Sequence, residues 1–140
     1  MLDPLRHSGG FADVVGRLTA WREGCAEVTV TLNAEHMNRS GVMHGGVLTT
    51  MTDTACGYTG CYTAKPDQPR RTCTLSLETR FLAEAESGST ITVTAEKTGG
   101  GRQIFFSRAQ AVDQDGRPVG QGSGTFRYRS SPTVAPGEDT

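Results

Sequence analysis

The sequence lacks any excess of one charge. Its 140 residues carry 14 Lys and Arg against 15 Asp and Glu, for a formal net charge of −1. A nucleic acid or an anionic membrane as partner therefore has no electrostatic support. A basic, apolar leader is missing at the N-terminus, and the C-terminus matches no lipidation or retention motif. From these absences we expect a cytoplasmic protein.

Clustered metal ligands are also missing. The four cysteines, at positions 25, 56, 61 and 73, form no CxxC pair, and the three histidines are scattered. If residues 56 and 61 share a helix, their side chains point about 140° apart, which is wrong for a bridge or a shared metal. We expect no metal site and four small, buried thiols.

Charge is most conspicuously absent from residues 45–64, GGVLTTMTDTACGYTGCYTA, where Asp53 is the single charged side chain. Six threonines, four glycines and this aspartate argue against a membrane span. Wound as a helix, the segment has two faces. One is a stripe that fits a core: Val47, Met51, Ala55, Tyr58 and Tyr62. Nearly opposite lie Gly46, Thr50, Asp53, Gly57 and Gly60, which are small residues around one carboxylate.

A helix at a protein surface carries Lys, Glu or Arg on its outer face, and this segment has none. The pattern predicts that both faces are covered and that a ligand or a partner chain approaches the backbone near Asp53. Two alternatives stay open. The segment is an ordinary amphipathic helix whose aspartate makes a buried hydrogen bond, or it is not helical, since glycine and threonine are poor helix formers.

The rest of the chain alternates apolar and polar residues as half-buried strands do. A short helix is expected at 11–15, loops at 34–43 and 65–71, and a hairpin turn at Asp115-Gly116. Strands are expected at 16–22, 25–33, 71–82 (with Cys73, Leu75 and Leu77 on one face), 89–98, 99–116 after a turn, and 117–129. This order predicts an α+β fold in which a curled antiparallel sheet wraps one long central helix. Residues 1–129 form the single domain, and residues 130–140 form a disordered tail.

The residues before the predicted helix and in its first half carry a resemblance. Asn38, then His44-Gly45-Gly46 six residues later, then Asp53 nine residues after the histidine, resemble the pattern of hotdog-fold acyl-CoA thioesterases of the phenylacetate-degradation (PaaI-like) type. The similarity spans about residues 9 to 129. It implies a hotdog fold, an acyl-CoA substrate and no separate cofactor. It further implies a homodimer or a dimer of dimers, in which Asp53 of one subunit faces the helix N-terminus of the other.

The chemistry of thioester hydrolysis fits the same residues. The reaction passes through a tetrahedral oxyanion, which needs fixed hydrogen-bond donors, and a helix N-terminus presents unpaired N–H groups. We expect the Gly45 N–H to be the principal donor, with the Asn38 amide helping. Asp53 is expected to act as general base or as nucleophile. His44 is expected to hold the loop and Asn38 in place. The resemblance assigns Thr74 a part in holding the water.

Coenzyme A carries phosphates, so basic residues are expected around the pocket mouth. Lys97 and Arg102 flank three glycines and are the first candidates, followed by Arg71, with Gly46 also placed at the substrate. Arg70 and Arg129 are weaker candidates. Two other functions stay open: an acyl-thioester hydratase or dehydratase, which would need His44 as a catalytic group, and a non-catalytic acyl-CoA-binding module. The acyl group is left undetermined by the sequence.

Overall fold

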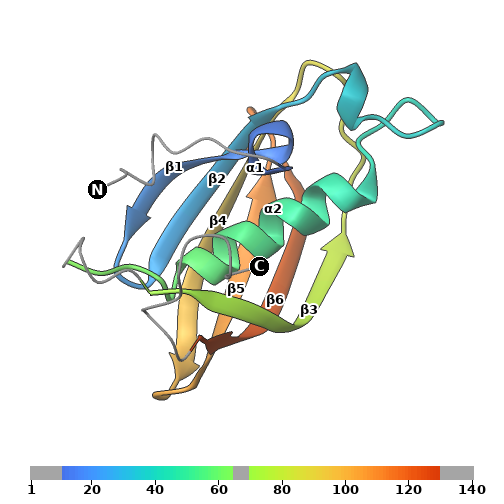
Figure 1. Cartoon of the computed structure of the whole chain (residues 1–140). Helices are drawn as coiled ribbons and strands as arrows, with labels where there is room; N and C mark the ends of the chain where they lie inside the picture. The colour runs from blue at the N-terminus through green and yellow to red at the C-terminus, as the bar shows by residue number, and fades with distance from the viewer. Residues whose placement is uncertain (1–10, 65–69, 130–140) are drawn as a thin grey trace.

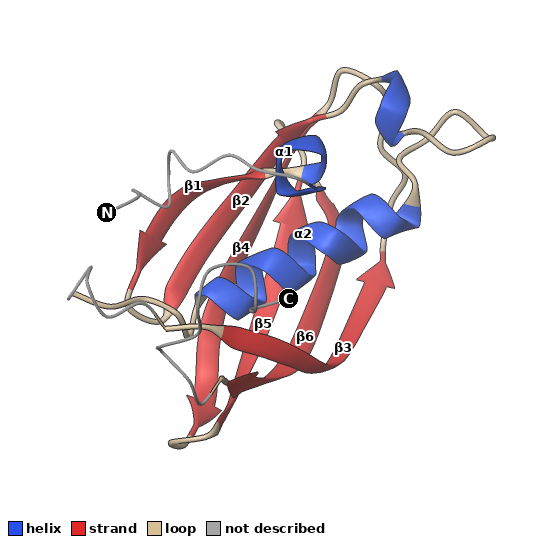
Figure 2. Ribbon diagram, viewed as in Figure 1, coloured by secondary structure: helices blue, strands red, loops and turns tan. Residues whose placement is uncertain are grey.

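The computed structural model of the chain describes residues 11–64 and 70–129. In these residues six strands form one antiparallel sheet in the order β1-β2-β4-β5-β6-β3. They are β1 (Arg17–Arg22), β2 (Cys25–Thr31), β3 (Thr72–Phe81), β4 (Thr90–Gly100), β5 (Ile104–Val112) and β6 (Pro118–Tyr128). The long helix α2 (Gly45–Tyr58) lies across the concave face of the sheet, preceded by the short helix α1 (Phe11–Val15) and the 3-10 turn η1 (Ala34–His36) (Figures 1 and 2). The predicted hotdog architecture is confirmed. The expected tail and residues 65–69 of the expected loop lie outside the described residues.

The core lies between α2 and the sheet. Alternate residues are buried along β2, the first half of β4 and β5, as in the run Ala26, Val28 and Val30 of β2. The helix contributes the buried side chains of Val47, Leu48, Met51, Thr52, Ala55 and Cys56. Burying a large apolar side chain contributes about 1.5–3 kcal/mol, which offsets the roughly 1 kcal/mol that each glycine costs a helix. Tertiary packing therefore holds a segment of poor helix propensity in helical form.

The helix ends earlier than expected, at Tyr58 instead of residue 64. Thr59 caps it, and its hydroxyl donates to the Cys56 carbonyl at 2.7 Å. Tyr62, expected on the core stripe of the helix, lies beyond this cap and makes an edge contact with Trp21 of β1. The Trp21 indole N–H also donates to the Tyr58 carbonyl at 2.8 Å. Contacts with β1, which the local sequence does not encode, set the end of the helix.

The small-residue stripe divides into two parts. Asp53 and Gly57 are half-buried and Gly46 is exposed, so within one chain this face is not fully covered. Gly60 is different: it is buried, and a Cβ there would lie 2.4 Å from the ring of Phe105. Gly60 is therefore required by internal packing and not by the approach of a ligand.

We expect Gly60→Ala to lower the free energy of unfolding by about 1–3 kcal/mol, the usual cost of overpacking. Phe105 is fully buried and stacked on Phe126, so its ring has no room to withdraw. The matched control is Gly57→Ala, whose Cβ would lie 3.6 Å from Phe126, an ordinary contact. Urea denaturation of both variants measures the difference. Equal stability of the two variants would contradict this assignment of Gly60.

A bulge in the edge strand β3 overturns the expected common face of Cys73, Leu75 and Leu77. Thr74 pairs with Phe126 and Ser76 with Thr125 of β6, so Leu75 has no partner of its own. An extra residue reverses the alternation of side chains along a strand.

Before this bulge the even-numbered side chains of β3 point toward the helix side of the sheet, and after it the odd-numbered side chains do. Before it, Thr72 and Thr74 contact Cys61 and Asp53. After it, Phe81 packs against Gly45 at the start of the helix. Leu75 itself is 51% exposed.

The predicted hairpin between the last two strands is confirmed. Asp113 and Gly116 close the turn, and Gly116 has a φ of +79°, a conformation that glycine adopts without strain. The strand β4 continues beyond its expected end at residue 98, through Gly100, and the chain reverses over residues 101–103 before β5. The expected loop at 34–43 contains η1 and a bridge between Met37 and Met43.

Candidate active site

The structure brings Asp53 and Thr74 together. The Thr74 hydroxyl donates a 2.6 Å hydrogen bond to Oδ1 of Asp53, joining the middle of α2 to the edge strand β3. Asp53 is half-buried and Thr74 is exposed, so the pair is reachable from outside and not sealed in the core. Among the described residues no other hydrogen bond engages the carboxylate, which leaves Oδ2 available for a proton or a ligand.

His44 caps the N-terminus of α2. Its Nδ1 accepts the Gly46 N–H at 2.8 Å, with φ −60° and ψ 135° at the cap. An Nδ1 that accepts carries no proton, so the ring is a neutral tautomer with its hydrogen on Nε2. The Gly46 N–H is therefore engaged within the chain. No hydrogen bond between His44 and Asn38 occurs among the described residues.

The His44 cap leaves the Gly45 N–H without a hydrogen-bond partner among the described residues. Gly45 is the first helical residue. An unpaired N–H at a helix N-terminus, at the positive end of the helix dipole, stabilises a nearby oxyanion. The Phe81 ring lies against this residue, because a Cβ on Gly45 would be 3.2 Å from a ring carbon. The local sequence gives no signal for Phe81, whose orientation depends on the bulge.

Asn38 organises the loop before the helix. Its Oδ1 accepts the backbone N–H groups of Ser40 at 2.9 Å and Val42 at 3.3 Å, which leaves its Nδ2 as a donor. His36, nearby in the chain, is buried, and its carbonyl accepts the His44 N–H at 2.8 Å. Its ring accepts the Asn33 N–H at 2.9 Å and bonds the Val14 carbonyl of α1.

Asp53 and Gly45, the two halves of the candidate site, lie apart within one chain. Asp53 follows Gly45 by eight residues of the same helix, a rise of about 12 Å along the axis at 1.5 Å per residue. A carbonyl that accepts from the Gly45 N–H is therefore out of reach of the same chain's Asp53 carboxylate. The structure brings Thr74 to Asp53 and Phe81 to Gly45, but it does not bring Asp53 to Gly45.

The basic candidates gather near one end of the sheet. Strand register places the end of β4, the start of β5, the end of β6 and the start of β3 side by side there. The Arg70 guanidinium lies 4.0 Å from the centroid of the Tyr128 ring, and the Lys97 ammonium lies 3.5 Å from the Tyr128 hydroxyl. The exposed Arg71, Arg102, Arg127 and Arg129 complete this basic end. Arg127 was missed, although it alternates with Arg129 in the last strand.

The thiols near the helix are not nucleophiles at neutral pH. Burial raises the pKa of Cys56 to about 11, against a lowering by its hydrogen bond with Ser107. Burial likewise raises the pKa of Cys61. The described part of the chain holds no group of His, Cys, Asp and Glu side chains placed to bind a metal ion. It also contains no helix of the length and apolarity that a membrane crossing requires.

Known proteins are similar to this chain in sequence and in architecture. The sequence pattern of the thioesterase superfamily matches residues 40–119. The proposed esterase PA0474 of Pseudomonas aeruginosa is 29% identical over 125 residues, covering 88% of this chain and 91% of that one. The acyl-coenzyme A thioesterase PaaI of Escherichia coli is 32% identical over 97 residues, covering 69% of this chain and 66% of the relative.

A solved structure agrees with these relatives. The E. coli PaaI protein from the phenylacetic acid degradation operon superimposes with a TM-score of 0.77 at 26% identity, over 86% of this chain and 84% of that one. The match over 40–119 includes the Asp53–Thr74 pair and the N-terminus of α2. The chain therefore belongs to the thioesterase superfamily and is a thioester hydrolase with the PaaI-like hotdog fold.

Proposed function

We propose that this protein hydrolyses acyl-CoA thioesters to a free acid and coenzyme A. The observation that carries the proposal is the reachable Asp53–Thr74 pair, combined with the unpaired Gly45 N–H on the same helix. A thioester hydrolase needs a base or nucleophile and an oxyanion donor, and these residues supply both. The naming of the E. coli relative as an acyl-coenzyme A thioesterase supports the choice of substrate class.

In this proposal, a water molecule attacks the thioester carbonyl carbon and gives its proton to the free Oδ2 of Asp53. The Thr74 hydroxyl fixes the carboxylate through Oδ1. The tetrahedral oxyanion accepts from the Gly45 N–H, with the Asn38 amide as a second donor. Collapse of the intermediate breaks the C–S bond, and the departing thiolate takes the proton from Asp53. The alternative chemistry is direct attack by Asp53 on the carbonyl carbon, which breaks the C–S bond, expels the CoA thiolate and gives a mixed anhydride that water then hydrolyses to the free acid and the Asp53 carboxylate.

The 12 Å between the two halves is bridged if two chains pair, so we include a homodimer in the proposal. β3 is an edge strand of the sheet, and exposed apolar side chains lie on it or directly after it. Leu75, Phe81 and Leu82 are 51%, 59% and 55% exposed. An edge with such side chains pairs readily with another strand, and two-fold pairing of β3 with its copy would cover them. Association of two such dimers into a tetramer is compatible with this arrangement.

A thiol-reagent assay against a panel of acyl-CoAs tests the function. Release of free CoA with aryl-acetyl, hydroxybenzoyl or medium-chain substrates supports the proposal and identifies the acyl preference. A change in enoyl absorbance without thiol release would instead establish a hydratase. Binding without turnover would establish a non-catalytic acyl-CoA-binding module.

The basic end of the sheet is our candidate for the CoA phosphates. Hydrogen bonds to charged groups contribute about 1.5–3 kcal/mol, so we expect the double variant Lys97→Glu, Arg102→Glu to raise KM for an acyl-CoA roughly tenfold or more. Hydrolysis of the matching acyl-N-acetylcysteamine, which has the same thioester and no phosphates, serves as the control and should be unchanged. An equal rise in KM for both substrates would refute the assignment of the CoA phosphate site to this end of the sheet.

A further inference from the structure

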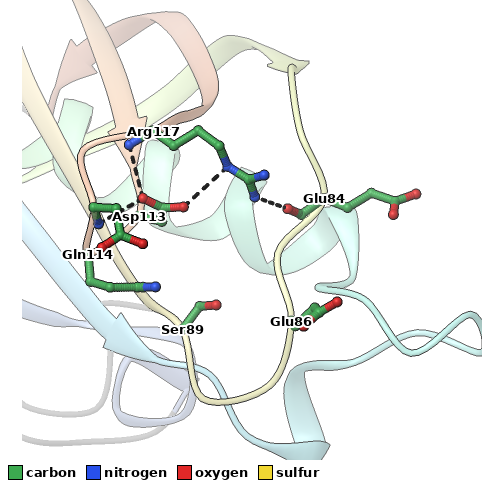
Figure 3. A pocket seen from close by; sticks show the side chains of 7 residues that line it. Glu84, Glu86, Ser89, Asp113, Gln114 and Arg117 are labelled. Carbon is green, nitrogen blue, oxygen red and sulfur yellow. Dashed lines mark hydrogen bonds and ion pairs between the residues drawn. The ribbon is translucent and has the colours of Figure 1, made fainter.

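The turn between β5 and β6 contains a nearly buried carboxylate, that of Asp113. The Asp113 side chain is 9% exposed, and its Oδ1 accepts the backbone N–H groups of Asp115 and Arg117, each at 2.9 Å. Its Oδ2 lies 3.2 Å from Nε of Arg117 (Figure 3). The hydrogen bond from the Arg117 backbone N–H is the main cause that lowers the pKa of the Asp113 carboxyl below its ordinary value. This group is therefore an anion at neutral pH.

The Arg117 guanidinium also reaches a distant segment of the chain. Its Nη2 donates to the carbonyl of Glu84 at 2.7 Å, across 33 residues of sequence. Figure 3 shows the guanidinium between the Asp113 carboxylate and the Glu84 backbone. Glu84 lies in the connection between β3 and β4. The planar side chain of Arg117 thus contacts the hairpin through Nε and the β3–β4 connection through Nη2.

The connection between β3 and β4 is hydrogen-bonded to the segment that leads into α2. The residue after Glu84 is the buried Ala85, whose carbonyl accepts the Met43 N–H at 2.7 Å. Met43 is itself buried and precedes Gly45 by two residues. The contacts therefore run from Asp113 through Arg117 and the 84–85 backbone to Met43, two residues before the first residue of α2.

We propose that Arg117 is a positioning residue for the Gly45 N–H in thioester hydrolysis. This inference rests on the proposed function, because it concerns the oxyanion donor of that reaction. An oxyanion donor is effective only when it is held in place before the reaction, and small misplacements cost large factors in rate. Arginine is suited to the position because its rigid fork makes both contacts at once, which the single ammonium of lysine does not.

The test compares Arg117→Gln and Arg117→Lys with a matched surface pair. The control is Arg108→Gln, which breaks the exposed ion pair of Arg108 with Glu96 between β5 and β4, away from the helix start. We expect both Arg117 variants to lower kcat about tenfold with KM unchanged, since the misplaced donor acts in the transition state. We expect Arg108→Gln to keep wild-type kinetics. Thermal unfolding of each variant reports whether the fold is retained.

A double-mutant cycle separates positioning from general support of the fold. In a Gly45→Pro background, which lacks the N–H, Arg117→Gln should have no further effect on kcat. The same tenfold loss in both backgrounds, or no loss in the wild-type background, would overturn the inference while thioester hydrolysis by the wild-type protein stands. Absence of any hydrolysis by the wild-type protein would instead refute the proposed function. If Arg117→Gln does not fold, the same cycle with Arg117→Lys decides the question.

Discussion

Replacing Asp53 by asparagine is expected to lower kcat by roughly 10²–10⁴-fold, the usual range for a positioned acid–base group. Asparagine has the same shape and still offers an oxygen to the Thr74 hydroxyl, which bonds Asp53 at 2.6 Å. The fold and the assembly should therefore stay as in the wild type. Steady-state release of CoA measures the loss, and circular dichroism with sedimentation verifies the structure.

Thr74→Val is the companion variant, because it removes the hydroxyl and leaves the carboxylate. We expect a smaller loss in kcat, about tenfold, from a carboxylate that is no longer held in one orientation. Near-wild-type turnover by a clean preparation of Asp53→Asn would refute the assignment of Asp53. Single turnover in ¹⁸O-water then distinguishes the two roles, since label enters the Asp53 carboxylate only if this group attacks the carbonyl.

Mixing two variants of strongly reduced activity should restore turnover if each site uses Gly45 of one chain and Asp53 of the other. Asp53→Asn lacks the base, and Gly45→Pro lacks the N–H donor. Heterodimers formed by co-refolding would hold one doubly defective site and one intact site. Because half of the dimers are mixed, activity should recover to about a quarter of the wild-type value. If each chain carries a complete site of its own, mixing restores nothing.

Proline at position 45 removes the N–H while keeping a backbone conformation that the helix start accepts. Gly45 is the first residue of α2, the position at which proline fits a helix. The preceding residue, His44, has ψ 135°, which is the conformation required before proline. Gly45→Ala is the control, because its Cβ meets the Phe81 ring as proline does while the N–H remains. A loss of roughly 10²–10³-fold in kcat for proline beyond that for alanine measures the donor itself.

Local patterns in the sequence were sufficient for the elements and for the central helix. Alternating residues predicted β2 and β4, the Asp115-Gly116 pair predicted the last hairpin, and the absence of charge around Asp53 singled out α2. These features depend on neighbours within a few residues, where side-chain periodicity and turn chemistry act directly. The spacing of Asn38, His44 and Asp53 was also readable, because all three lie on or just before one helix.

Contacts between distant residues were decided by the tertiary structure alone. The bulge at Leu75 reverses the faces of β3, which turns Thr74 toward Asp53 and Phe81 toward Gly45. The engagement of the Gly46 N–H by His44 depends on the conformation of the cap, and the grip of Arg117 on Glu84 spans 33 residues. The sequence by itself therefore determined which residues are candidates for the chemistry and on which elements they lie. Strand register and helix termination were settled only by long-range packing, since each depends on groups that the folded chain brings together from separate segments.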